Sequence, residues 1–134
     1  MTRPTRAFKL RLSNDGIDLL IDCHCHLIRS TRQLLAWGTT LHIAVNYLET
    51  LPIAEVVKLL TCLPMLGLRG QSEHYLGAPC GLKDIADRIV ASVAIAAPAC
   101  RPPALAHIYL VSLQAAACAD EAAVRNIYQR VTGN

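Results

Sequence analysis

Aromatic side chains are scarce in this 134-residue chain. They make up 4% of the residues, with one Trp and one Phe, whereas apolar residues together reach 53%. The core must therefore be built from Leu, Ile, Val and Ala, and Ala favours closely packed helices over sheets. The length suits one domain that can bury a core without disulfides or metal. The composition thus predicts a single, mostly α-helical domain.

Charged residues are also few, at 17% against about 25% in a typical domain. This composition leaves apolar surface to cover, so we expect at least a dimer, or docking into a larger assembly. Long uninterrupted apolar runs are missing as well. Arg101 is the only formal charge between Ile89 and Ala119, but prolines from Pro98 to Pro103 break that run before the ~20 residues that a bilayer core requires. We expect no membrane insertion, and instead a central helix buried on all sides.

The N-terminus lacks the apolar segment of a secretory signal. We therefore expect a cytoplasmic protein whose six cysteines are reduced, with Cys62, Cys100 and Cys118 behaving as small hydrophobic residues. The first 14 residues carry Arg and no acid, so a mitochondrial transit peptide is the alternative.

The net charge of +3 is concentrated at the N-terminus. The basic residues that precede the first acid, Asp15, are Arg3, Arg6, Lys9 and Arg11. Residues 7–12 alternate between apolar and polar side chains, which predicts a short strand. We therefore expect a basic arm over residues 1–14 and a helical domain over 15–134. A lone strand is unstable, so this one must pair with a symmetry mate, another protein or a second strand of this chain.

Apolar residues spaced three and four apart predict a bundle of five to six helices behind that strand. The first helix is expected over 15–37, capped by Ser13 or Asn14 and closed by Gly38, and the second begins at Thr39 or Thr40. The third is capped by Thr50 and stopped by Pro64. The fourth runs from Asp84 to about Pro98, the fifth begins at Pro102-Pro103, and the last follows Asp120 and ends at Gly133. Between the third and the fourth, residues 67–81 contain four glycines and predict a long loop. Its glycines do not match a phosphate-binding loop.

The segment Asp22-Cys23-His24-Cys25-His26 is the densest cluster of potential metal ligands. It falls within the first expected helix, whose apolar stripe includes Ile17, Leu20, Ile21, His24, Leu27, Ile28, Thr31, Leu34 and Leu35, opposite a polar face of Asp18, Asp22, Cys25, Arg29 and Arg32. On a helix His24 and His26 point roughly 200° apart. We therefore predict that His24 faces the core and that His26 does not.

Residues 19–27, an apolar run that leads into Asp-x-His-x-His, resemble the strand-end metal motif of TatD-type and PHP-type metal-dependent hydrolases. This resemblance implies that Asp22, His24 and His26 bind metal in a barrel that supplies further ligands from later strands. The chain lacks the alternating strands and helices of such a barrel. A helical zinc site is a second possibility, in which Cys23 or Asp22 pairs with His26 and two loop residues, His74 and Cys80, complete the set.

The strand followed by helices also resembles ribbon-helix-helix DNA-binding proteins, although the first helix here is longer and the usual second-helix pattern is missing. We therefore predict a non-enzymatic, self-associating subunit without cofactors that contacts nucleic-acid backbone, DNA or RNA, through Arg3, Arg6, Lys9, Arg11, Arg29 and Arg32. The alternatives are the hydrolase or zinc protein and an antagonist or adaptor that docks through apolar helices. In the expected loop, Glu73, His74 and Tyr75 are the most plausible exposed contacts.

Overall fold

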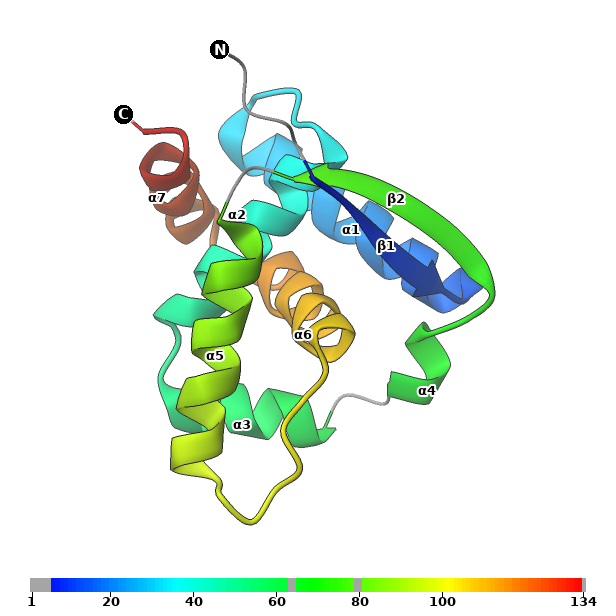
Figure 1. The fold of residues 1–134 in the computed structure, drawn as a ribbon. Coiled ribbons are helices and arrows are strands. Elements are labelled where there is room, and N and C mark those ends of the chain that lie inside the picture. Colours follow the sequence, from blue (N-terminus) through cyan, green and yellow to red (C-terminus); the bar gives the residue numbers. More distant parts are fainter. Residues whose placement is uncertain (1–5, 63–64, 79–80, 134) are drawn as a thin grey trace.

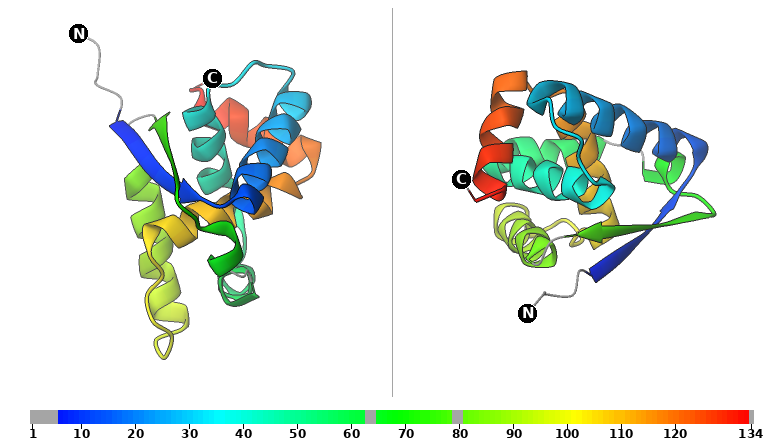
Figure 2. Two further views of the ribbon diagram at one scale, coloured as in Figure 1. Left: turned by 90° about the vertical axis from the view of Figure 1, so that its right-hand side faces the viewer. Right: turned by 90° about the horizontal axis from the view of Figure 1, so that it is seen from above.

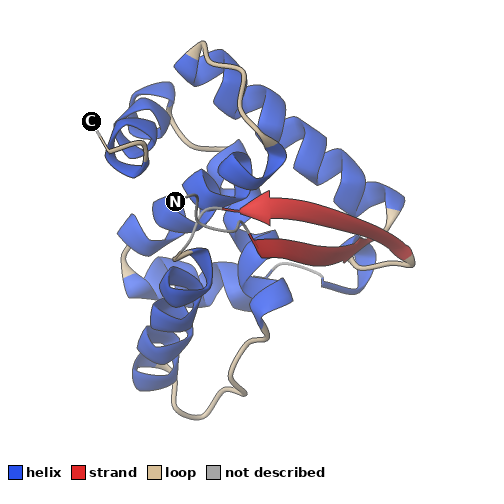
Figure 3. Cartoon of the chain, turned by 45° about the horizontal axis from the view of Figure 1, so that its top comes forward, coloured by secondary structure: helices blue, strands red, loops and turns tan. Residues whose placement is uncertain are grey.

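The computed structural model describes residues 6–62, 65–78 and 81–133. It is a single, mostly helical domain, as the composition predicts (Figure 1). The elements in these ranges are β1 (Arg6–Leu12), α1 (Asn14–Thr31), α2 (Trp37–Thr50), α3 (Ile53–Cys62), α4 (Met65–Leu68), β2 (Ser72–Ala78), α5 (Leu82–Ala96), α6 (Leu105–Ala117) and α7 (Glu121–Val131). The two strands lie on one side of the helices (Figure 3).

Helix α6 forms the centre of the domain, as its nearly charge-free sequence predicts. It contacts α1, α2, α3 and α5, and a continuous run from Ile108 to Leu113 is buried. Figure 1 shows the other helices arranged around it. None of the helices in the described ranges combines the length and the apolar character that a membrane span needs.

The two strands form an antiparallel ribbon in which Lys9 lies opposite Tyr75. The prediction of a loop over residues 67–81 is therefore wrong, because most of this segment forms the end of α4 and strand β2. The inner face of the ribbon buries Leu10 and Leu12 from β1 and Leu76 from β2. One face of the described part of the N-terminal arm thus belongs to the core, and of the three partners considered for this strand it pairs with a second strand of this chain.

Ser13 fixes the corner between β1 and α1. Its Oγ accepts a hydrogen bond from the Gly16 N–H at 3.1 Å, which confirms the predicted N-cap. The same hydroxyl donates to the Gly67 carbonyl at 2.6 Å, and the Ser13 N–H donates to the Leu68 carbonyl at 2.9 Å. One residue therefore caps α1 and ties the corner to α4.

Helix α1 is shorter than predicted. It ends at Thr31, where Arg32 adopts the left-handed conformation with φ of 57° and donates its N–H to the Ile28 carbonyl. The predicted apolar stripe, which ended at Leu35, included Leu34, whose side chain is 94% exposed. Helix α2 starts at Trp37, so Gly38 lies in its first turn and closes no helix. Pro64, the expected end of α3, lies outside the described residues.

The cysteines differ from the expectation. Cys62, Cys100 and Cys118 are exposed, although their apolar sequence neighbours predicted burial. Cys23 is instead fully buried in the core, and Cys25 is exposed. Cys62 and Cys118 lie at the ends of α3 and α6, and Cys100 lies in the loop between α5 and α6.

Candidate functional site

The Asp22–His26 cluster lies in the middle of α1, so the extended backbone of the hydrolase motif is not formed. Nδ1 of His24 lies 2.6 Å from Oγ1 of Thr40, and its ring stacks on Trp37 with centroids 3.9 Å apart. Nε2 of His26 donates to the Ala119 carbonyl at 2.7 Å. Both histidines are half-buried, so the prediction that His26 points away from the core is wrong.

The remaining members of this cluster also face different surroundings. Cys23 is enclosed by the core, and burial raises the pKa of its thiol to about 12, with Cys118 adding to the effect. Its thiolate, the form that binds metal, is therefore disfavoured. Asp22 is exposed on the other side of the helix. In the described part of the chain no three His, Cys, Asp or Glu side chains come together as a metal site, and Cys80 lies outside that part.

The structure brings together only some of the basic residues predicted to contact phosphate. Lys9 and Arg11 both point to the outer face of the ribbon, where Glu73 lies 3.3 Å from the Lys9 Nζ and 3.6 Å from the Arg11 Nε. Arg29 and Arg32 are exposed at the far end of α1, which is about 27 Å long. Figure 2 shows β1 and α1 diverging from their common corner. Arg6 begins β1, and Arg3 lies outside the described residues.

Arg69 is a basic residue that the sequence interpretation missed. It shares a hollow of about 230 Å³ with Lys9 and Arg11, next to Ala106 in the first turn of α6. Its position follows from the pairing of β1 with β2, since the Gly70 N–H donates to the Arg11 carbonyl. Because Arg69 fell in the expected loop, only knowledge of that pairing could have placed it beside the arm.

A second hollow, of about 360 Å³, lies between α1 and β2. We call it the α1–β2 groove, and its lining residues are Ile17, Leu20, Ile21, Trp37, His74, Tyr75 and Leu76. Three of them are large apolar side chains left in solvent: Ile21 is 42% exposed, Trp37 43% and Tyr75 67%. The sequence analysis predicted Tyr75 as an exposed contact residue but did not predict the groove that it lines.

The groove also borders a free strand edge. Strand β2 pairs with β1 on one side only, and within the described ranges no other strand or backbone group bonds to its second side. The main-chain N–H and C=O groups along that edge therefore have no backbone partner in the described part of the chain. The α1–β2 groove is thus bounded on one side by apolar side chains of α1 and on the other by β2, which also contacts α2.

Comparison with known proteins found no matching family model, no similar curated protein and no similar solved structure.

Proposed function

We propose that this protein is a non-enzymatic interaction subunit that binds an extended segment of a partner protein in the α1–β2 groove. The observation that carries the proposal is the free edge of β2 lying beside exposed Ile21, Trp37 and Tyr75. An added strand gains affinity from main-chain hydrogen bonds to such an edge, and specificity from pockets that accept alternate side chains.

The apolar lining is sufficient for moderate affinity. Complete burial of a large apolar side chain contributes about 1.5–3 kcal/mol. Ile21, Trp37 and Tyr75 are each exposed by about half, so covering all three contributes roughly 2–5 kcal/mol before the main-chain hydrogen bonds are counted. This range, together with the hydrogen bonds, matches a reversible interaction better than a permanent one.

The charge beside the groove indicates what the partner segment carries. Asp18 and Asp22 follow the lining residues Ile17 and Ile21 by one position on α1, and Asp15 lies one turn earlier. All three carboxylates are exposed, and none forms an ion pair with a described residue. We therefore infer a segment with apolar side chains at alternate positions and basic residues on the flank that faces α1.

Selection from a random heptapeptide library tests this proposal. Selected peptides should alternate apolar residues and contain Lys or Arg, and Ile21→Ser and Tyr75→Ser should each weaken their binding at least about tenfold, equivalent to about 1.4 kcal/mol. Ile95→Ser is the matched control, because Ile95 is 83% exposed on α5, outside the groove lining. N-methylation of alternate peptide amides should also abolish binding. Peptides that bind both groove variants as well as the wild type would contradict the proposal.

The low charge fraction supports self-association, and four exposed free thiols, Cys25, Cys62, Cys100 and Cys118, support a cytoplasmic location. Sedimentation at micromolar concentration tests the first of these. A clean monomer would remove self-association and leave the peptide-binding proposal in place.

A second candidate function is contact with nucleic-acid backbone, supported by the hollow that Lys9, Arg11 and Arg69 share. Glu73 offsets part of that charge. If Lys9 and Arg11 each contact a phosphate, Lys9→Ala with Arg11→Ala should flatten the dependence of log K on log salt by roughly 1.4–1.8. Arg125→Gln with Arg130→Gln on α7 is the control. An unchanged slope, or no binding of DNA or RNA at low salt, would eliminate this candidate.

A further inference from the structure

A pocket of about 380 Å³ lies at the start of α6, bounded by α3, the end of α5 and the loop between α5 and α6. This volume falls in the range of small-molecule sites. Its walls are mainly apolar, with Val57 and Leu60 from α3, Val93 from α5, and Pro102 and Pro103 from the loop. The shape and lining therefore suit the hydrocarbon part of a small ligand.

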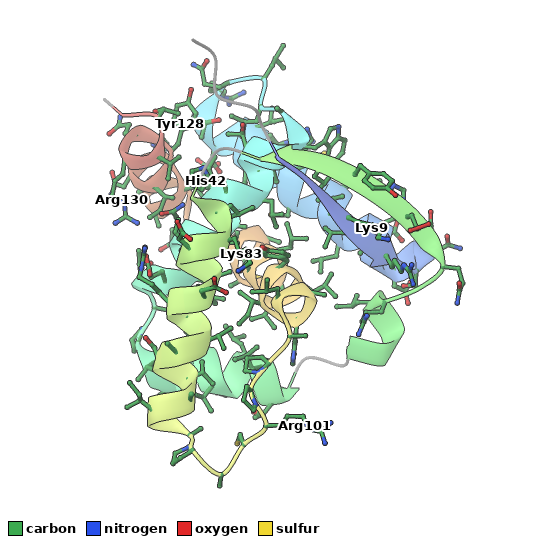
Figure 4. All side chains as sticks on the ribbon, viewed as in Figure 1. Lys9, His42, Lys83, Arg101, Tyr128 and Arg130 are labelled. Carbon is green, nitrogen blue, oxygen red and sulfur yellow. The ribbon has the colours of Figure 1, made fainter. Side chains whose placement is uncertain are left out.

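The charged side chains that line this pocket are both cations, Arg69 and Arg101. Neither forms an ion pair with a described residue. The segments around the pocket also lack acids, because no Asp or Glu occurs between Glu55 and Glu73 or between Asp87 and Asp120. Figure 4 shows Arg101 extending from the loop beside the end of α3. The positive charge at the pocket therefore has no counter-charge from the described protein.

The first turn of α6 adds polar groups to the same pocket. Ala104, the N-cap residue, provides no side-chain hydrogen bond, so the first N–H groups of α6 have no cap. His107 lines the pocket, and its Nε2 atom is buried without a hydrogen-bond partner among the described residues. Burial lowers the pKa of His107, an effect that the Leu60 backbone partly offsets.

We infer that this pocket binds an amphipathic monocarboxylate, with its hydrocarbon chain against the apolar walls and its carboxylate at Arg69 and Arg101. Guanidinium groups bind carboxylates through paired hydrogen bonds, which favours this head group. A polyphosphate ligand would place a strongly hydrated body against the walls of Val57, Leu60 and Val93. A purely apolar ligand would leave the two cations unused. The site lies apart from the α1–β2 groove, so this inference does not depend on the proposed peptide binding.

A series of straight-chain carboxylates from butanoate to decanoate tests the inference by calorimetry on the full-length chain. Each CH₂ buried contributes about 0.8 kcal/mol, so Kd should fall about fourfold per carbon until the pocket is full. Octanoate should bind at least about tenfold more tightly than octanol, because octanol lacks the charge. No saturable binding at millimolar concentrations, or equal affinity for octanol, would overturn the inference.

Variants of the two arginines test the head-group position. Arg69→Gln and Arg101→Gln should each weaken octanoate binding about tenfold or more, while Arg125→Gln on α7 should leave Kd unchanged. Ala97→Leu, which places a larger side chain in the pocket lining, should shorten the chain length at which affinity stops increasing. Far-UV circular dichroism on every variant confirms folding. Unchanged affinity in both arginine variants would show that the carboxylate does not lie at Arg69 and Arg101.

Discussion

The corner at Ser13 makes Gly16 a position at which a single added methyl group should destabilise the fold. Gly16 is the third residue of α1, and a Cβ added there would overlap the carbonyl oxygen of Leu68 and approach two atoms of Leu12 at 3.2 Å. That oxygen accepts the 2.9 Å hydrogen bond from the Ser13 N–H. Because the obstacle is backbone, no side-chain rotation can relieve the overlap. Gly16→Ala should therefore push α1 and α4 apart.

The magnitude follows from three opposing contributions. Overpacking costs about 1–3 kcal/mol. Weakening of the Ser13 to Leu68 hydrogen bond adds about 1 kcal/mol. Replacing glycine by alanine in a helix returns about 1 kcal/mol. The free energy of unfolding should therefore fall by roughly 1–3 kcal/mol in Gly16→Ala.

Urea denaturation followed by far-UV circular dichroism measures this change as a lower midpoint with an unchanged slope. Gly67→Ala is the control, because a Cβ on Gly67 would have no atom within 4 Å and its substitution should be neutral or slightly stabilising. The reasoning is refuted if Gly16→Ala matches or exceeds the wild type in stability, since helix propensity would then outweigh the overlap.

Three further predictions concern the core and its histidines. Thiol labelling followed by mass spectrometry should modify Cys25 in the native protein and Cys23 only on unfolding, because Cys23 is buried with a pKa of about 12; equal labelling rates would contradict its burial. Burial lowers the pKa of His24 and of His42 below 6.5, so on acidification the unfolded chain binds protons before the folded chain does. Urea midpoints should therefore be highest above about pH 6.5 and fall as the pH is lowered. The free energy of unfolding should fall by less than about 1.4 kcal/mol per pH unit for each histidine. A midpoint that rises on acidification would contradict this sign. Leu27→Ala should cost about 2–5 kcal/mol of unfolding free energy, because Leu27 is fully buried, and a loss below 1 kcal/mol in the same assay would contradict that burial.

Local sequence signals predicted the helices well. The nearly charge-free stretch between Ile89 and Ala119 indicated a helix buried on all sides after the prolines, and α6, buried from Ile108 to Leu113, is that helix. The last helix begins after Asp120 as expected, although the Asp120 side chain makes no capping hydrogen bond. Each of these predictions depends on residues within a few turns of one another, where helical periodicity is informative.

Features that depend on distant residues were not predictable. Strand β2 contains Gly77 and polar residues, and Leu76 is its only large aliphatic side chain, so no alternation identifies it without its partner. The buried face of α1 is centred on Cys23 and Leu27, because α6 and α7 pack there. The apolar stripe predicted from the sequence instead included Leu34, which is exposed. The α1–β2 groove and the position of Arg69 both follow from the missed strand, which is why the candidate site was incomplete.

The pairing of β1 with β2 also constrains how the chain folds. Lys9 and Tyr75 are partners although they lie 66 positions apart in the sequence, so β1 leaves the ribosome long before its partner strand exists. Until then the apolar side of β1, with Leu10 and Leu12, has no strand to cover its edge, a state that favours association with other unfinished chains. Closing this long loop is an entropic cost that local helix formation does not share, so ribbon formation should be a late and slow step in folding.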